Sequence, residues 1–223
     1  MARPRVVGDD ALLDRAMHLF WRSGYANTGI RELERALGLK APGIYNRFGS
    51  KDGLFQAALD YYLDKVIGWR IEHYLEASDP LLGLRKFFDT TYSYISADRP
   101  ALSCLLVNTS LEIGPRNIPV HGLLEKGVET LRTALGDNLR RAQTMGQVRA
   151  DADVPTLARH LLLCLHGLTV AGNIETDKAT LSRQVDVIFS ALPLRQGPSA
   201  HTAEPEPNLP AAFEQDAHIG SGN

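Results

Sequence analysis

The chain has 223 residues, of which 44% are hydrophobic and 22% charged, so it is long enough for one large soluble domain or two small ones with a real core. Its formal net charge of −2 gives no whole-chain signal for a nucleic-acid or membrane partner, and its two cysteines are too few for a disulfide framework. No signal-peptide pattern opens the chain, and no apolar run approaches the ~18 residues of a membrane span. We therefore expect a cytoplasmic protein with reduced thiols and no membrane partner.

Charge is distributed unevenly along the sequence. Residues 1–51 hold nine Lys and Arg against five Asp and Glu, which leaves +4 on this segment and −6 on the remainder. A basic end on an acidic body is expected where that end meets a polyanion. A solvated basic surface would give the same count.

The amino-terminal quarter predicts short helices with clear boundaries. Apolar residues at helical spacing follow an acidic start and predict a first helix that stops at Gly24. Thr28 is expected to cap a short second helix that Gly38 ends. A third short helix is expected over 40–48, and Ser50 is expected to cap a long fourth helix that reaches about residue 76.

The rest of the chain is also helical, so the fold class is all-α with about nine helices. Further helices are expected from Asp79-Pro80, over about 101–113, around 124–139, from 153, and around 181–192. Residues 193–223 are rich in Pro, Gly, Ser and Glu and predict a disordered tail.

Residues 28–48 have the dimensions of a helix-turn-helix, in which two short helices meet at a tight turn. The second helix is then the candidate reader of the DNA major groove. Pro42 costs little in the first turn of a helix, because its missing N–H had no partner there. Gly43 removes side-chain bulk, which lets the helix start approach a phosphate or base edge.

Polar residues around this helix are the candidate DNA contacts. Tyr45 and Lys51 can reach phosphates, whereas Lys40, Ala41 and Asn46 face outward and can contact base edges. The full predicted set is Thr28, Arg31, Lys40, Ala41, Pro42, Gly43, Tyr45, Asn46 and Lys51. The alternative is a plain helix-loop-helix corner whose aromatic residues belong to the core.

The stretch HLFWRSGYANTGIRELERALGLKAPGIYNRFGSKDGLFQAAL resembles the N-terminal domain of the TetR family of transcriptional regulators. Two positions depart from the family pattern, because Lys40 stands where Ser or Thr is usual and Arg47 where His or Tyr is usual. Both changes add positive charge and bear on base preference. The matching elements are Phe20, Gly24-Tyr25, Thr28, Ile30, Leu33, Ala36-Leu37-Gly38-Leu39, Gly43-Ile44-Tyr45, Phe48, Ser50-Lys51-Asp52 and Leu54.

The resemblance implies a homodimeric regulator, mostly a repressor in this family, that a ligand releases from near-palindromic operator DNA. It implies a DNA-binding domain at 9–55, an effector-binding and dimerisation domain at 56–192, and a dimer interface formed by the last two helices, at about 155–192. Their apolar character fits that interface, although an intramolecular core would have the same character.

The effector is less defined by the sequence. Polar candidates in the middle helices, at about 79–172, are Tyr92, Tyr94, Asn108, Glu112 and His166. Cys104 is expected at the start of a helix, as in a TetR-like subgroup whose cysteine senses electrophiles or oxidants. The helix dipole there would favour the nucleophilic thiolate, whereas a buried core cysteine would be inert.

Two alternatives come from other functional classes. An all-helical enzyme is disfavoured because the sequence has no catalytic motif and no metal-ligand spacing, and no cofactor is predicted. His160 and His166 are six residues apart and fall on different faces of a helix. A small-molecule-binding protein with a vestigial helix-turn-helix is the other alternative.

Overall fold

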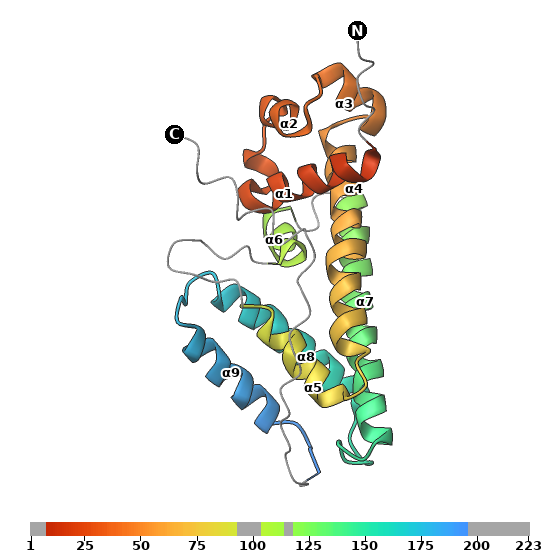
Figure 1. Ribbon diagram of the computed structural model, residues 1–223, viewed down its shortest axis with the longest axis vertical. Coiled ribbons are helices and arrows are strands. Elements are labelled where there is room, and N and C mark those ends of the chain that lie inside the picture. The colour runs from red at the N-terminus through yellow and green to blue at the C-terminus, as the bar shows by residue number, and fades with distance from the viewer. Residues whose placement is uncertain (1–7, 93–103, 114–117, 196–223) are drawn as a thin grey trace. The chain divides into compact units, whose positions relative to one another are not determined.

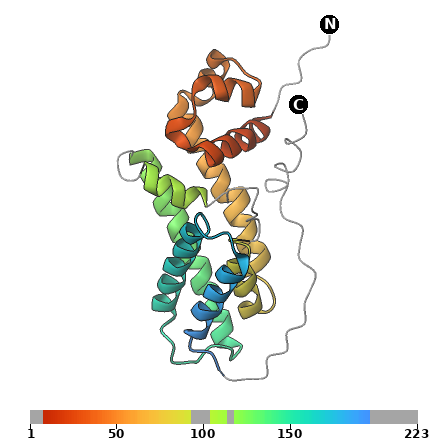
Figure 2. The ribbon, with the colours of Figure 1, turned by 90° about the vertical axis from the view of Figure 1, so that its left-hand side faces the viewer.

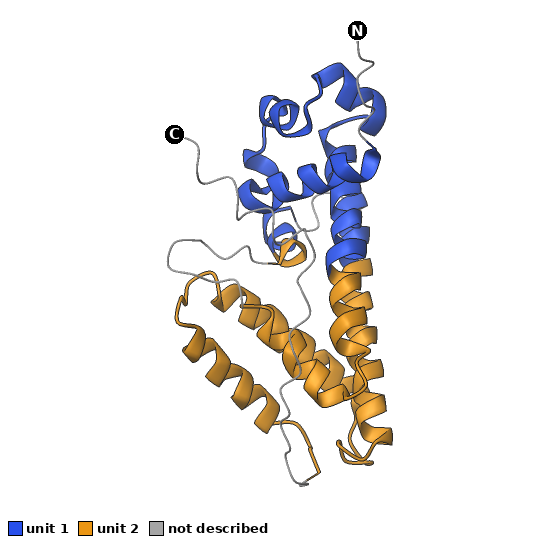
Figure 3. Ribbon diagram, in the orientation of Figure 1, with its two compact units in different colours: residues 1–66, 108–125, 209–223 blue, residues 67–107, 126–208 orange. Residues whose placement is uncertain are grey.

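The computed structural model describes residues 8–92, 104–113 and 118–195, which form nine α-helices and no strand (Figure 1). This confirms the all-α prediction. The chain divides into two compact units, coloured separately in Figure 3. The first contains residues 1–66, 108–125 and 209–223, and the second contains residues 67–107 and 126–208. This division groups 56–66 and 108–125 with the helix-turn-helix, whereas the sequence-based boundary falls at residue 55.

Four helices at the amino terminus build the first unit around an aromatic core. Phe20 meets Phe55 edge to face at 4.9 Å between ring centroids, and Trp21 meets Tyr62 in the same way at 5.1 Å. Such pairs add about 0.5–1.5 kcal/mol to the gain from burying the rings. The helices are α1 (Asp9–Asn27), α2 (Ile30–Leu37), α3 (Ala41–Phe48) and α4 (Lys51–Tyr62).

The predicted boundaries of these helices are mostly confirmed, but the predicted stop of the first helix at Gly24 is wrong: α1 breaks at Gly24 and ends at Asn27. Gly38 ends α2 with a φ of 67°, a left-handed conformation that favours glycine, and Ser50 caps α4 by accepting the Gly53 N–H at 3.0 Å. The prediction that Thr28 caps the second helix is wrong. The N-cap position is Gly29, and the buried Thr28 hydroxyl instead donates to the Gly24 carbonyl at 2.6 Å, which closes the end of α1.

Helical structure continues beyond α4 through two π-helical segments, Leu63–Gly68 and Ile71–Leu75. The fourth helix therefore ends close to the predicted residue 76. The chain passes from the first unit into the second within this stretch. Two later helices, α6 (Leu105–Glu112) and α7 (Ile118–Thr144), also cross the boundary between the units.

Within the second unit, α9 (Lys178–Ser190) packs against both α5 (Pro80–Asp89) and α8 (Val154–Ala171). Figure 2 shows α8 and α9 side by side. Phe88 and Phe189 meet edge to face at 5.8 Å, and Arg85 joins the two elements by pairing with both Asp89 and Asp186. The second unit therefore has a packed core of its own.

Residues 193–195 are ordered, which shortens the predicted disordered tail at its start. The Pro193 carbonyl accepts the Arg149 N–H at 2.9 Å, and the Arg195 N–H donates to the Gln147 carbonyl at 2.9 Å. These hydrogen bonds flank a single antiparallel bridge between Val148 and Leu194. The remaining tail residues, 196–223, lie outside the described residues.

By length and composition alone, the 18 residues of α8 would also suit a membrane span, with a mean hydropathy of 1.3. This differs from the expectation that no apolar run approaches such a span. Core helices of soluble proteins meet the same criterion, and 39% of α8 is buried inside the protein. Two large apolar residues of α8, Leu163 and Val170, are exposed.

Candidate nucleic-acid interface

The start of α3 is capped from the preceding helix rather than by its own N-cap residue. Lys40 occupies the N-cap position without a side-chain cap, and the Glu34 carboxylate of α2 accepts the Ala41 N–H at 2.8 Å. Pro42 has no N–H to satisfy, and the Gly43 N–H donates to the Lys40 carbonyl at 2.8 Å. The helix therefore needs no Ser or Thr at position 40, and the Lys40 side chain is left for another role.

One face of α3 packs inward and the other is open to solvent. Ile44 is fully buried, whereas Pro42, Tyr45 and Asn46 are exposed, with 43% of the tyrosine accessible. An exposed tyrosine at this level is available to an external partner. Together with Lys40, these residues give α3 a mixed cationic and hydrogen-bonding outer surface, as direct readout of a DNA groove requires.

Gly43 is not required by the packing of the chain itself. A Cβ atom at this position would have Leu39 Cβ, at 4.0 Å, as its closest neighbour, which is an ordinary van der Waals distance. The backbone there is also helical, so no positive φ calls for glycine. Because no side chain covers the start of this helix, an external phosphate or base could approach its backbone closely.

The other predicted contacts differ in exposure. Arg31 on α2 is exposed, Ala41 and Lys51 are half-buried, and Thr28 has no exposed surface. Thr28 therefore offers no side-chain surface to DNA. Arg47, one of the two departures from the family pattern, pairs with Asp9 at 3.2 Å, so part of the charge that it adds is neutralised within the chain.

Lys51 belongs to a small cluster around Tyr25, which the sequence analysis did not single out as functional. The Lys51 ammonium lies 4.2 Å from the centre of the Tyr25 ring, and the Tyr25 hydroxyl donates to the Asp52 carboxylate. Burial of the ring, followed by the hydrogen bond and negative charge of Asp52 and the charge of Glu112, raises the pKa of Tyr25 to about 12. The phenol thus stays protonated, and the ring provides a fixed base for Lys51.

Glu112, predicted as a wall residue of the effector pocket, contacts the end of α1. Its carboxylate accepts the N–H groups of Tyr25 at 2.9 Å and Ala26 at 2.6 Å. Glu34 and Glu112 are thus two structural acids that sequence reasoning did not connect to this region. Glu34 and Ala41 are seven residues apart in the sequence, and Glu112 and Tyr25 are 87 residues apart. Neither contact could be predicted from the local sequence pattern.

The other predicted effector residues are scattered over the described chain. Tyr92 is buried and donates to the Asp89 carboxylate at 2.6 Å, and its pKa is raised by burial and then by that carboxylate. Burial lowers the pKa of His166, whose Nε2 atom is buried without a hydrogen-bond partner. Asn108 lies within α6, and Cys104 is half-buried directly before this helix. Tyr94 lies outside the described residues.

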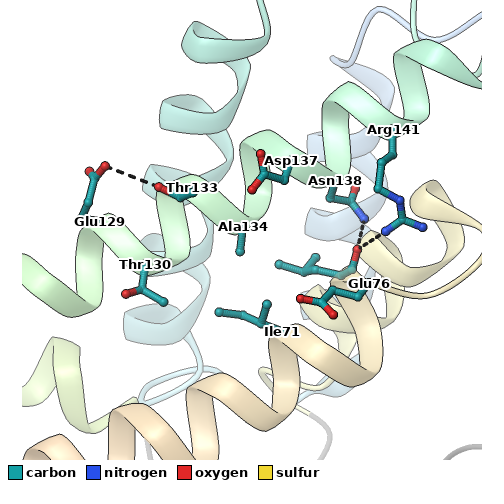
Figure 4. A pocket seen from close by; sticks show the side chains of 10 residues that line it. Ile71, Glu76, Glu129, Thr130, Thr133, Ala134, Asp137, Asn138 and Arg141 are labelled. Carbon is teal, nitrogen blue, oxygen red and sulfur yellow. Dashed lines mark hydrogen bonds between the residues drawn. The ribbon is translucent and has the colours of Figure 1, made fainter.

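A pocket of about 580 Å³ lies within the second unit, between the π-helical segment Ile71–Leu75 and α7 (Figure 4). None of the predicted effector residues that the structure describes lines it. At one end, Asn138 and Arg141 both donate to the Leu75 carbonyl, at 2.8 and 3.0 Å. The lining residues are Ile71, Leu75, Glu76, Glu129, Thr130, Thr133, Ala134, Asp137, Asn138 and Arg141.

Within the described part of the chain, no group of three or more His, Cys, Asp or Glu side chains could hold a metal ion. One pair of possible ligands is His160 and Cys164, with Nε2 and Sγ 3.6 Å apart on α8. Burial raises the pKa of the Cys164 thiol, which disfavours the thiolate that a metal or an electrophile would need.

The chain thus has two short helices joined by a tight turn, and the second helix is capped and exposed. This arrangement defines the class of helix-turn-helix DNA-binding proteins. Two family models match the chain: "Bacterial regulatory proteins, tetR family" over residues 12–58, and "Tetracyclin repressor-like, C-terminal domain" over residues 80–188. The chain belongs to the TetR family of transcriptional regulators, which are DNA-binding regulators and not enzymes.

Two curated relatives span most of the chain. The HTH-type transcriptional repressor ComR of Escherichia coli (strain K12) is 29% identical over 194 residues, which are 86% of this chain and 90% of ComR. The uncharacterized HTH-type transcriptional regulator YezE of Bacillus subtilis (strain 168) is 26% identical over 193 residues, 86% of this chain and 100% of YezE.

Similar solved structures include a cysteine mutant of the TetR family regulator CifR complexed with 26 bp double-strand operator DNA. It is 29% identical, has a TM-score of 0.74, and covers 85% of this chain and 99% of that chain. The reduced form of Escherichia coli NemR has a TM-score of 0.75 at 17% identity, covers 84% of this chain and 99% of NemR, and supports the fold alone.

Proposed function

We propose that this protein is a homodimeric transcriptional repressor that binds a near-palindromic operator through α3 and Lys51 and is released by a small molecule or an electrophile. The observation that carries the proposal is the outer surface of α3. The side chains of Lys40, Tyr45 and Asn46 are exposed to solvent there, and Gly43 has no side chain that would keep DNA from the start of the helix. The cytoplasm is the matching location, since the proposed partner is genomic DNA.

The related proteins support the DNA partner. ComR is named as a repressor, and the CifR structure contains operator DNA. In helix-turn-helix proteins, the recognition helix enters the major groove, and paired half-sites lie about a helical turn or multiples apart. A two-fold protein dimer on a near-palindromic site satisfies this geometry.

Exposed apolar residues support the dimer. Leu163 is 71% exposed on α8 and Val187 is 62% exposed on α9, and Val170 and Ile174 add to the same two-helix region. These exposed apolar side chains lie on, or just after, two helices that pack together, and covering them at an interface would gain free energy because it removes apolar surface from water. A second copy of the chain would cover them through an isologous contact.

Two features support the effector. The 580 Å³ pocket is within the range of about 300–1,000 Å³ that small-molecule sites occupy. Cys104 is half-buried immediately before the first turn of α6. The first feature fits a non-covalent ligand and the second fits an electrophile.

The proposal is tested by binding of the purified protein to the DNA that flanks its own gene, followed by a footprint. We expect a protected near-palindrome and affinity that falls steeply with salt, since phosphate contacts release counterions. A scrambled fragment of equal length is the control. Equal affinity for both fragments, or no binding at moderate salt, would overturn the proposal in favour of a small-molecule-binding protein with a vestigial helix-turn-helix.

A further inference from the structure

The backbone of α1 breaks at Gly24, three residues before the helix ends. Gly24 has a φ of 76° and a ψ of 168°, so the turn at 25–27 starts anew. The first N–H groups of a helical turn have no intrahelical acceptor, and leaving them unpaired costs free energy wherever water is excluded. The N–H groups of Tyr25 and Ala26, which lie at the protein surface, are therefore open to an acceptor from elsewhere in the chain or from water.

Glu112 provides that acceptor from the last residue of α6. One carboxylate oxygen accepts the Tyr25 N–H at 2.9 Å and the other accepts the Ala26 N–H at 2.6 Å. A Cβ atom at position 24 would lie 3.0 Å from the same carboxylate, so glycine there also makes room for the contact. The glycine at position 24 and the carboxylate at position 112 are thus both suited to this contact.

The position of Glu112 within its own helix is unfavourable. An acid in the last turn of a helix faces the negative end of the helix dipole. The two hydrogen bonds to α1 offset this cost, because bonds to an ionised carboxylate are stronger than neutral ones. A locally unfavourable residue with a specific distant partner is the kind of conflict found at functional sites.

Tyr25 connects this contact to the DNA-binding surface. Its backbone is held by Glu112, while its ring lies under the Lys51 ammonium and its hydroxyl donates to Asp52, at the first turn of α4. The ring also packs 5.0 Å from Phe55 in the core. A shift of the 25–26 backbone therefore moves the ring that supports Lys51.

We propose that Glu112 is a positioning residue for the DNA interface, which sets the place of Lys51 by holding the Tyr25 and Ala26 amides from the end of α6. The inference rests on the proposed function and names the way in which α6 acts on it. Any event that draws the end of α6 away from Gly24 releases both amides at once and loosens the support of Lys51.

The direction in which operator affinity changes distinguishes a positioning role of Glu112 from a purely electrostatic one. Removing a negative charge from a DNA-binding unit ordinarily strengthens binding to phosphate. Loss of positioning weakens it. In Glu112→Gln, one amide keeps an oxygen acceptor, but the new NH₂ group faces the other N–H, so the substitution removes the charge and half of the contact.

The experiment compares operator affinity, its salt dependence and amide exchange in the parent, Glu112→Gln and Glu112→Ala. Glu125→Gln is the matched control, since it removes the same charge from an exposed residue of the first unit. We expect operator affinity to fall about threefold for Glu112→Gln and about tenfold for Glu112→Ala. The salt slope of these Glu112 variants should be reduced by about 0.9, because one phosphate contact is lost. Glu125→Gln should not weaken operator binding. Exchange of the Tyr25 and Ala26 amides should quicken only in the Glu112 variants.

A double-mutant cycle with Lys51→Ala completes the test. If Glu112 acts through Lys51, Glu112→Ala should lower neither affinity nor salt slope further once Lys51 is absent. Additive losses, or tighter binding by Glu112→Gln, would overturn the positioning role while leaving operator binding by the parent intact. Failure of the parent to bind any flanking DNA would overturn the proposed function, and with it the role given to Glu112.

Discussion

The Glu34 carboxylate accepts the Ala41 N–H at 2.8 Å, so α2 caps α3, the proposed recognition helix. This relationship explains why Lys40 can stand where a Ser or Thr cap is usual. Because Pro42 has no N–H and Gly43 already bonds to the Lys40 carbonyl, the Ala41 N–H is the one among residues 41–43 that needs an outside acceptor. The side chain at position 40 was thereby freed from a structural role.

The cap predicts the effect of Glu34→Ala. Loss of a helix cap costs about 1 kcal/mol, and we expect this reduction in the free energy of unfolding. Operator affinity should also fall, because the start of α3 loses its fixed position. Urea unfolding and DNA titration measure both, with Arg35→Ala on the solvent side of the same helix as the control. An unchanged free energy of unfolding would show that the contact is not a cap.

Lys40→Thr should behave in the opposite way. We expect the free energy of unfolding to stay within about 0.5 kcal/mol of the parent, since Lys40 contributes no side-chain cap. Operator binding should change in base preference, or its salt slope should fall by about 0.9 if Lys40 contacts a phosphate. Equal affinity, equal preference and an equal salt slope would remove Lys40 from the interface.

The apolar surface of α8 and α9 predicts the effect of Leu163→Glu. A carboxylate buried at a two-fold interface is repelled by the same carboxylate of the partner or is desolvated without a counter-charge, so we expect dissociation to monomers. Operator affinity should then fall by about 10²-fold or more, because the two half-sites no longer bind jointly. Light scattering gives the oligomeric state. Met145→Glu, which places the same charge at an exposed apolar residue outside α8 and α9, is the control and should stay dimeric. A dimeric Leu163→Glu protein would exclude this face.

Cys104 predicts a specific response to electrophiles. Treatment with a maleimide should release the parent from its operator, whereas Cys104→Ser should stay bound. Cys164→Ser is the matched control and should respond as the parent does, because burial raises the pKa of the Cys164 thiol and lowers its thiolate fraction. Equal release of the parent and Cys104→Ser would end the sensor hypothesis.

His166 predicts a pH effect on stability. Burial lowers its pKa in the folded protein below the ordinary value of 6.5, so the unfolded chain binds the additional proton first as pH falls. The contribution of the neutral imidazole is therefore fully present above about pH 6.5 and is lost as pH falls through that value toward the lower folded pKa. Urea unfolding at several pH values should show a weaker decline in His166→Gln than in the parent, and identical declines would contradict the assignment.

Much of the fold followed from local sequence signals. The stops at Gly38 and Gly49, the cap at Ser50 and the Asp-Pro start of α5 are properties of a few adjacent residues, and the structure has each of them. Thr28 failed as a cap because the competing acceptor, the Gly24 carbonyl, became available only when α1 broke at Gly24. The ordering of 193–195 likewise depended on a distant partner, the backbone of 147–149.

The sequence by itself determined an all-helical chain, the place of its helix-turn-helix and the outward residues of its second helix, because helix boundaries and periodicity are local. Only the tertiary structure decided that Glu34 caps α3, that Tyr25 supports Lys51, and that Glu112 holds the end of α1. A carboxylate has the same local pattern whether it faces water, a ligand or a backbone amide. Its partner is set by which unpaired N–H groups the folded chain brings within reach.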